Sequence, residues 1–446
     1  MKRATLASFD GEPLKGVLIL VENLPVPFDR RVWQEACALR DAGYQVSVIC
    51  PKGVGYDLSR EVIDDVHIYR YHLPVEGASA LGYLREYGTA LTMSFLLSLR
   101  VWWKRGFDVI HACNPPDLFF LIGAFYRLFG KKFLFDHHDL NPELYLAKFG
   151  RKGVLYKVLV LLERLSFRTA QVSIATNESY RKIAIERGGM SPDKVFVVRS
   201  GPSLERMRQV PRDETLKHGR AFLVCYLGVM GKQEGVDDLL RAVRHIVRDQ
   251  GRTDVHFGII GGGTSLPELK RMAGDLDIAD FVTFTGRVPD DIMLSYLNTA
   301  DVCVNPDKPS VMNDLSTMNK IMEYMALGKP IVQFDLREGR HSAQQASLYA
   351  RCGDVQDFAA QILTLLGDPA LRTEMGEFGR RRVLGHLQWR HQVPHLLEAY
   401  ATLWAKRRNE NPAHQQPPGH AAAALAGALA SDQDDRTQDS SAGQPR

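Results

Sequence analysis

The chain has 446 residues, which is too long for one hydrophobic core and favours two domains of ordinary size. Its apolar content of 45% and charged content of 24% are typical of globular proteins, and a net charge of +4 without an aromatic–basic motif gives no reason to expect a nucleic-acid partner. Six well-separated cysteines include no C-x-x-C pair, so neither a zinc site nor a disulfide framework is predicted, and we expect a reducing compartment.

The first part of the chain alternates apolar strands with helices. Residues 16–21 form the continuous apolar run of a buried parallel strand, and a loop over 22–29, a helix over 30–42 and a strand over 44–50 follow. This order is Rossmann-like, but the Gly-x-Gly-x-x-Gly fingerprint is missing, which disfavours a dinucleotide and therefore a dehydrogenase.

A long helix is predicted over residues 81–105. Near its end, Trp102, Trp103, Lys104 and Arg105 combine aromatic and basic side chains beside an apolar face, which suits a membrane interface. A helix that packs on the sheet has the same pattern, so both interpretations stay open.

Polar residues gather where the next strands end. A strand over 107–111 ends at His111, and a strand over 132–135 runs into the sequence D-H-H-D-L-N-P-E at 136–143. Two histidines and three carboxylates are an unusual density at the carboxyl end of a strand, where ligands bind in open α/β sheets. A hydrogen-bonded strand end is the alternative. Further strands are predicted over 66–72, 171–175 and 195–199, and further helices over 118–129 and 155–170.

The strand–helix order starts again after a predicted hinge at 200–202. A strand over 222–228 precedes a glycine-rich loop and a helix over 236–248, and a strand over 256–260 ends in three glycines at 261–263. Those glycines suit either a nucleotide pocket or a simple tight turn. The remaining predicted strands are 281–287, 301–304 and 331–334, and the remaining helices are 355–366 and 394–406.

The most informative stretch is residues 313–330. Its apolar residues recur at i, i+3, i+4, i+7 and i+8 from Met318, which predicts one buried helical stripe, with Ser316 as the N-cap and Gly328 at the C′ position. Two such α/β halves predict a cleft between facing strand ends.

The polar residues of this helix predict a nucleotide site. Ser316, Thr317 and the free N–H groups of a helix start suit an anion such as a diphosphate, and Lys320 lies one turn further on. Glu323 lies on the same face and suits two ribose hydroxyls. A capped surface helix with a Lys–Glu pair is the alternative interpretation.

Four regions in this order resemble the family 4 glycosyltransferases of the GT-B fold. They are residues 22–43, 108–143, 226–240 with 260–263, and 305–330, and the likeness spans about 15–405. The resemblance implies an α/β fold of two Rossmann-like domains that face each other across a cleft, with a C-terminal helix that crosses back to the first domain. The implied division is an acceptor domain over 15–203, a nucleotide-sugar domain over 204–388, the returning helix over 389–408 and a disordered tail over 409–446.

The resemblance also implies a function. It implies a retaining, metal-independent glycosyltransferase that moves a sugar from a nucleotide-sugar donor to a lipid-linked or oligosaccharide acceptor, in the synthesis of cell-surface polysaccharide or glycolipid. No cofactor other than the donor substrate is implied. No signal peptide follows Met1 and no window holds about 18 uncharged apolar residues, so we expect a cytoplasmic protein. The basic balance and Trp102–Arg105 suggest the inner face of the membrane and a polyprenyl-linked acceptor.

Site residues follow from the resemblance position by position. The catalytic residues it implies are Lys320, His138, Asp139 and His111. The donor-binding residues it implies are Glu323, Ser316, Thr317, Asn319, Asp314, Gly262, Gly263, Lys232, Arg287 and Gly228. The loop residues that face the acceptor and the diphosphate are Phe28, Asp29, Arg30, Asn114 and Glu143.

The chain departs from the family pattern on the donor side. Leu315 stands eight residues before Glu323, where the family often has a second glutamate, and Asp314 is the neighbouring carboxylate that would replace it.

Further departures concern cations and a histidine. Val229 and Glu234 stand where the family has an arginine and a lysine, so Lys232 is the nearest available cation, and Cys113 stands where a histidine is common. These departures keep two alternatives open: a nucleotide-sugar 2-epimerase of the same fold, and a non-catalytic transferase subunit that binds lipid or a partner.

Overall fold

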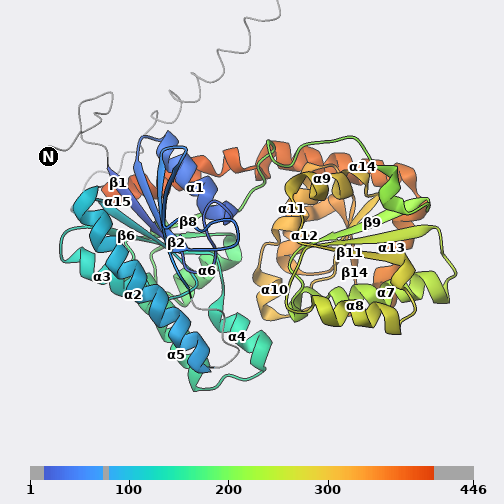
Figure 1. The fold of residues 1–446 in the computed structure, drawn as a ribbon, viewed down its shortest axis with the longest axis horizontal. Coiled ribbons are helices and arrows are strands. Elements are labelled where there is room, and N and C mark those ends of the chain that lie inside the picture. Colours follow the sequence, from blue (N-terminus) through green and yellow to red (C-terminus); the bar gives the residue numbers. More distant parts are fainter. Residues whose placement is uncertain (1–14, 74–79, 406–446) are drawn as a thin grey trace, which may run out of the picture. The chain divides into compact units, whose positions relative to one another are not determined.

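The computed structural model describes residues 15–73 and 80–405, so the predicted disordered tail at 409–446 lies outside the described residues. The described chain contains two separate sheets, each flanked by helices (Figure 1). Every predicted strand is present, and the first, expected at 16–21, is β1 (Gly16–Leu20). Two observed strands, at 60–63 and 347–350, were not predicted. The predicted class, two Rossmann-like α/β domains, is therefore confirmed.

The first sheet has eight strands in the order β3-β4-β2-β1-β5-β6-β7-β8, and every pairing is parallel except β3 with β4. Its other strands are β2 (Gln45–Pro51), β3 (Arg60–Ile63), β4 (Val66–Tyr71), β5 (Val109–Cys113), β6 (Lys132–His137), β7 (Val172–Ala175) and β8 (Val195–Val197). Its helices are α1 (Arg30–Asp41), α2 (Ala80–Lys104), α3 (Phe120–Arg127), α4 (Asn141–Phe149), α5 (Val154–Thr169) and α6 (Glu178–Glu186).

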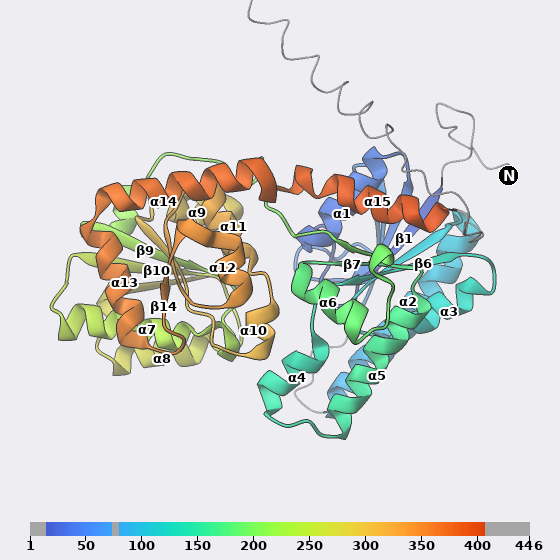
Figure 2. The same ribbon diagram turned by 180° about the vertical axis from the view of Figure 1, so that it is seen from behind.

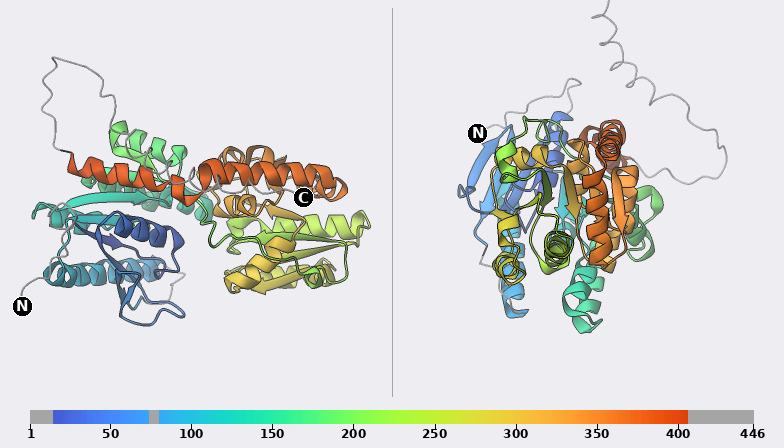
Figure 3. Two further views of the ribbon diagram at one scale, coloured as in Figure 1. Left: turned by 90° about the horizontal axis from the view of Figure 1, so that it is seen from above. Right: turned by 90° about the vertical axis from the view of Figure 1, so that its right-hand side faces the viewer.

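Alternation along the strands places a core on each face of this sheet. In β1, Val17 and Ile19 belong to the core shared with α1, whereas Leu18 and Leu20 belong to the core shared with α2 and α3. The edge-on views show helices on both sides of the strands (Figure 3).

The second sheet has six parallel strands in the order β11-β10-β9-β12-β13-β14. The strands are β9 (Phe222–Leu227), β10 (Val255–Ile260), β11 (Val282–Gly286), β12 (Val302–Asn305), β13 (Ile331–Phe334) and β14 (Ser347–Ala350). The helices are α7 (Val236–Arg244), α8 (Leu266–Asp275), α9 (Asp290–Thr299), α10 (Val311–Leu315), α11 (Asn319–Ala326), α12 (Arg337–Ala343), α13 (Val355–Gly367) and α14 (Pro369–Arg382).

The last helix, α15 (Val393–Trp404), leaves the second domain and packs on the first (Figure 2). Its Leu396, Ala399, Tyr400 and Leu403 are buried in the core that also contains α1. The prediction of a C-terminal helix that crosses back is confirmed, and the first domain is therefore built from two distant parts of the sequence.

Candidate active site

The helix that carries Lys320 and Glu323 begins later than predicted. The expectation that Ser316 caps this helix is wrong, because Ser310 accepts a hydrogen bond from the amide of Asn313 and starts a separate short helix, α10. Ser316 follows the end of α10, and α11 begins at Asn319 without a side-chain cap. Gly328 lies at the predicted C′ position with a φ of 68°.

The Ser316 and Thr317 side chains contact the first domain. The Ser316 hydroxyl donates to the Met312 carbonyl at 2.7 Å and lies 2.9 Å from the Tyr180 hydroxyl. Thr317 Oγ1 accepts from Asn177 Nδ2 at 2.9 Å, and the same amide donates to the carbonyl of Leu315. The two hydroxyls predicted to hold a phosphate therefore join α10–α11 to the start of α6.

Asp314 is also engaged away from the predicted sugar site. Its carboxylate accepts from the Arg337 amide at 2.9 Å and pairs with the Arg337 guanidinium at 3.4 Å, so it stabilises the start of α12. In this structure Asp314 does not take the place of the missing glutamate at Leu315.

Lys320 lies in a buried ion cluster at the carboxyl ends of β9 and β12. Its ammonium is 3.1 Å from an Asp307 oxygen, 3.2 Å from a Glu234 oxygen and 3.4 Å from the Tyr226 hydroxyl. Burial lowers the pKa of Lys320, but the attraction of Asp307, Tyr226 and Glu234 outweighs burial and holds that pKa well above its usual value. Lys320 therefore stays charged.

The pKa of Glu234 is also raised, but here burial is the dominant cause. Burial raises its pKa to about 7, because the attraction of Lys320 does not offset burial and the repulsion of Asp307. The cluster therefore holds a charged Lys320 beside a carboxyl group, Glu234, that titrates near neutral pH.

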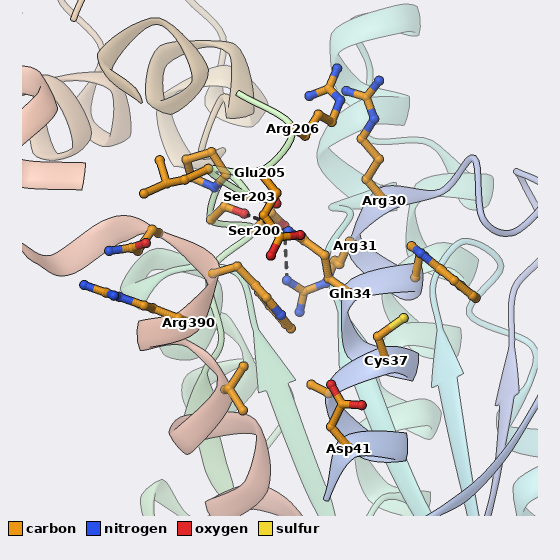
Figure 4. Close-up of a pocket in the computed structure, with 18 of the residues that line it drawn as sticks. Arg30, Arg31, Gln34, Cys37, Asp41, Ser200, Ser203, Glu205, Arg206 and Arg390 are labelled. Atoms are coloured by element: carbon orange, nitrogen blue, oxygen red, sulfur yellow. Dashed lines mark hydrogen bonds between the residues drawn. The ribbon is translucent and has the colours of Figure 1, made fainter. Parts of the chain in front are cut away.

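Glu323 is the centre of a network that joins the domains. Its carboxylate accepts from Arg206 at 2.8 Å and from Arg30 at 3.5 Å, and both arginines also pair with Asp290. Figure 4 shows the two guanidinium groups next to each other. The carboxylate predicted to hold ribose is thus accompanied by two cations that a diphosphate would also attract.

The loop after Gly228 packs against the loop formed by Gly261, Gly262 and Gly263. A Cβ on Gly261, whose φ is 129°, would lie 1.9 Å from the Gly228 carbonyl oxygen, and a Cβ on Gly263 would lie within 2.7 Å of the Met230 backbone. The Met230 amide donates to the Gly262 carbonyl at 2.9 Å. Only glycine permits this close approach of the two loop backbones.

Two further predicted residues meet across the domains. The Arg287 guanidinium lies 4.7 Å from the centre of the Phe28 ring, which brings a donor-side and an acceptor-side residue together. Asn319 and Lys232 are exposed, Lys232 in the turn after β9.

The acceptor side is organised by Asp136 at the end of β6. The carboxylate of Asp136 binds Arg31 through two bonds of 2.7 and 3.0 Å and lies 3.0 Å from His138 Nδ1. Burial lowers the pKa of His138, but Asp136 more than offsets burial and raises that pKa to about 9. At neutral pH His138 is therefore a cationic hydrogen-bond donor, with 12% of its side chain exposed.

Asn114 holds the His138–Asp139 loop in place. It accepts from the amides of His138 and Asp139 at 2.9 and 3.1 Å, and donates to the Asp139 carbonyl at 2.7 Å. Because it is only 1% exposed, Asn114 positions the loop and does not contact the acceptor directly. Burial raises the pKa of Asp139 and of Asp29, which caps α1 through the Val32 amide.

Two predicted acceptor-side residues are buried in the protein interior. His111 is 0% exposed, because β5 turns it toward the core under α15, where Nδ1 lies 2.9 Å from the Tyr400 hydroxyl. Glu143 is 7% exposed and pairs with Arg187 at 2.5 and 3.1 Å. Neither position allows direct contact with a substrate in this structure, so direct roles for His111 and Glu143 are not supported.

One group in the described residues has the composition of a metal site. Glu35, His111, Cys113 and Asp136 present ligand atoms within 4.8 Å of one another, all buried. Arg31 lies 2.7 Å from Asp136 and 3.1 Å from Glu35, so a positive charge already faces both carboxylates. These donors therefore fit an internal ion network better than a cation site.

A cavity of about 1090 Å³ adjoins the Glu323 network (Figure 4). It lies between α1, the linker after Ser200 and the start of α15, and Arg30, Asn319 and Glu323 are the predicted site residues that line it. Arg206, which binds Glu323, and Asp290, which binds Arg30, were not predicted as site residues, because neither belongs to a motif.

Two Rossmann-like domains with polar groups at facing strand ends define a protein of the GT-B class. Residues 29–201 match a family model described as "Glycosyl transferase 4-like domain", and residues 221–368 match one described as "Glycosyl transferases group 1". The chain therefore belongs to the family 4 glycosyltransferases, as the resemblance predicted.

Individual relatives agree with this assignment. The chain is 31% identical to a GDP-mannose-dependent alpha-(1-6)-phosphatidylinositol monomannoside mannosyltransferase of Mycolicibacterium smegmatis, over 40% of this chain and 47% of the relative. It is 29% identical to a D-inositol 3-phosphate glycosyltransferase of Thermomonospora curvata, over 50% of this chain and 55% of the relative. These matches span about half the length of each relative.

The fold has a close counterpart among solved structures. The sucrose-phosphate synthase of Thermosynechococcus elongatus aligns with a TM-score of 0.70 and 18% identity, over 87% of this chain and 99% of that chain. At this identity the likeness concerns the fold alone.

Proposed function

We propose that the protein transfers a glycosyl group from a nucleoside-diphosphate sugar to a lipid-linked glycan, with retention at the anomeric carbon and without a metal ion. The observation that carries the proposal is that each of the two sheets has a group of polar residues at the carboxyl ends of its strands. Glu323 and Lys320 share one helix at the strand ends of the second sheet, and His138 and Asp139 follow the end of β6 in the first.

The donor would bind at the second sheet. Glu323 would bind the ribose hydroxyls, the Gly228 and Gly262–Gly263 backbones would line the nucleotide, and Arg287 and Lys232 would lie at its edge. A diphosphate would compete with Glu323 and Asp290 for the guanidinium groups of Arg30 and Arg206, since phosphate oxygens are preferred guanidinium partners.

The leaving diphosphate needs cations and N–H donors at its developing charge. Arg30, Arg206, Lys320 and the first amides of α11 are the groups that would supply them. Lys320 becomes more available when Glu234 is protonated, because the cluster then loses one competing carboxylate.

We assign His138 the role of a positively charged hydrogen-bond donor and not that of a general base. With a pKa of about 9 it is protonated at neutral pH, so it would donate a hydrogen bond to the sugar or the phosphate. Asp139 is then the carboxylate that orients the acceptor hydroxyl, and Asn114 holds both residues in position.

The proposed acceptor is lipid-borne. The M. smegmatis relative is named for a phosphatidylinositol monomannoside acceptor, and a glycolipid or polyprenyl-linked sugar fits the same use here.

A screen of nucleotide sugars by thermal shift tests the donor assignment, because a bound donor raises stability by mass action. The matching donor is expected to raise the Tm of the wild type and to leave Glu323→Ala unchanged. A donor that stabilises both equally would contradict the assignment. A glycan product from donor plus acceptor supports the transferase, whereas an epimerised sugar from donor alone supports the epimerase.

One observation favours a second candidate, a non-catalytic subunit. Glu234 and Asp307 already neutralise Lys320, and Glu234 stands where the family has a lysine. Donor binding without hydrolysis or transfer would support this alternative.

A further inference from the structure

The hairpin formed by α4 and α5 exposes an unusual number of apolar side chains. Val154 is 80% exposed, and Phe149, Leu161, Leu155 and Val158 are 56, 54, 49 and 40% exposed. Both helices project together from the sheet (Figures 1 and 2). Nothing in the described chain covers this face.

The spacing on α5 makes these residues a stripe. Val154, Val158 and Leu161 recur at i, i+4 and i+7, so they lie on one face of the helix. The opposite face packs inward through Glu163 and Phe167, which are 0 and 1% exposed. The helix therefore presents apolar side chains in both directions.

The exposed charges of the hairpin all have one sign. The exposed cations between residues 141 and 170 are Lys148, Arg151, Lys152, Lys157, Arg164 and Arg168. The two carboxylates in that range, Glu143 and Glu163, are buried and paired with Arg187. An apolar stripe surrounded by uncompensated cations has the chemistry that binds an anionic bilayer.

The hairpin emerges next to the acceptor-side residues. Helix α4 begins two residues after Asp139, at the carboxyl edge of the first sheet. With nine residues at about 1.5 Å each, α4 separates Asp139 from the tip by about 13 Å. A bilayer at the tip would lie close to the acceptor site.

The alternative membrane contact, predicted at Trp102–Arg105, lies elsewhere. Trp103 is 92% exposed, but Trp102 packs edge-on against Tyr126 at 5.3 Å. Because α2 leads into β5, these residues lie at the amino edge of the sheet, opposite the edge that bears His138.

We propose that the exposed face of the α4–α5 hairpin docks on an anionic lipid bilayer, with Val154, Val158 and Leu161 inserted between headgroups and the cations against the lipid phosphates. The docking itself is independent of catalysis. The benefit of bringing a lipid-linked acceptor to His138 and Asp139 rests on the proposed function.

Co-flotation of the full-length protein with vesicles tests the surface. The wild type is expected to float with phosphatidylglycerol-containing vesicles, to bind phosphatidylcholine vesicles far more weakly, and to dissociate as salt is raised. Equal binding to both vesicle types, or no binding to either, would overturn the proposal, and no binding to either would leave a protein partner as the occupant.

Two variants test the location. The triple substitution Arg151→Gln, Lys152→Gln and Lys157→Gln is expected to weaken binding to anionic vesicles about a hundredfold. The pair Val158→Ser and Leu161→Ser is expected to abolish flotation at 0.15 M salt. Binding retained by both variants would overturn the assignment.

Matched controls separate the hairpin from charge in general. Lys104→Gln, Lys270→Gln and Arg271→Gln remove three cations outside the hairpin, and Trp103→Ser removes the exposed indole of α2. All of these variants are expected to bind within twofold of the wild type, and an equal loss in them would overturn the location. Donor hydrolysis without vesicles is expected to stay unchanged in every variant, so failure of docking and failure of catalysis are read separately.

Discussion

The two sheets hold buried ion clusters of opposite arrangement at their carboxyl edges. In the first domain Asp136 is shared by two cations, Arg31 and His138, and Arg31 also pairs with the buried Glu35. In the second, one cation, Lys320, lies between two carboxylates, Asp307 and Glu234. In the first domain the cation His138 is available to a ligand. In the second domain Lys320 is available only when one of its carboxylate partners is protonated or when its side chain moves.

The largest expected effect concerns the centre of the first cluster. Asp136→Ala leaves Arg31 and His138 without their shared partner, which is expected to reduce the free energy of unfolding by about 3–5 kcal/mol in urea denaturation. Asp335→Ala, which breaks the exposed pair with Arg340, is the control and is expected to cost less than about 1 kcal/mol. Equal losses in both variants would remove the distinction between the buried cluster and a surface pair.

The centre of the second cluster is expected to matter for turnover. Lys320→Ala removes one cation from the leaving diphosphate, and the rate at saturating donor is expected to fall about 10²–10³-fold. Release of nucleoside diphosphate measures this rate, with the exposed Lys270→Ala on α8 as the control. An unchanged rate would withdraw Lys320 from the catalytic machinery.

His138 is expected to give the first domain a pH dependence. Its pKa rises from 6.5 to about 9 on folding, so the stability it contributes is fully present below pH 6.5 and is lost as pH rises through 9. Compared with His138→Gln, the wild type is expected to lose about 2–3 kcal/mol more between pH 6 and 10. If the two proteins had parallel stability profiles, Asp136 would not stabilise the protonated form of His138.

Glu234 is expected to act in a lower pH window. Its pKa rises from 4.5 to about 7, so its contribution is present below pH 4.5 and is lost as pH rises through 7. Glu234→Gln is therefore expected to be more stable than the wild type at pH 8, by about 3 kcal/mol, and by less than about 1 kcal/mol at pH 5. A Gln variant that is less stable at pH 8 would mean that Glu234 is held ionised by Lys320.

The smallest expected effect concerns the hydrogen bonds from Asn177 of the first domain to Leu315 and Thr317 of the second. Asn177→Asp keeps the cap on the Tyr180 amide but loses the donor to Leu315 and Thr317, and is expected to cost about 1 kcal/mol. Urea denaturation measures the loss, and Asn177→Ala, which also removes the cap, is expected to cost more. Equal stability of Asn177→Asp and the wild type would assign no net energy to this contact.

Much of the fold was predictable because continuous apolar runs such as 16–21 have few alternatives to a buried strand. The start of α11 was not, because Ser316 has the sequence signal of a cap but follows α10, which Ser310 caps, and α11 begins at Asn319 without a side-chain cap. Helix α6 was also missed, although Asn177 before Glu178 is a recognisable cap signal.

The site was predictable only where spacing along one helix decides it. Lys320 and Glu323 share a helix as expected, but their partners Asp307, Glu234 and Arg206 come from other elements, and no local pattern relates them. His111 and His138 both sit near strand ends. Which of them is covered depends on α15, almost 300 residues further along the chain, so sequence reasoning could not separate them.

The return of α15 has a consequence for synthesis of the protein. The core of the first domain contains Tyr400 and Leu403, so it cannot be completed until the ribosome has made the whole second domain. At about 5–20 residues per second, the roughly 190 residues between β8 and α15 take about 10–40 s to translate. During that interval the apolar side chains of α1 that later contact α15 lack their native packing partners.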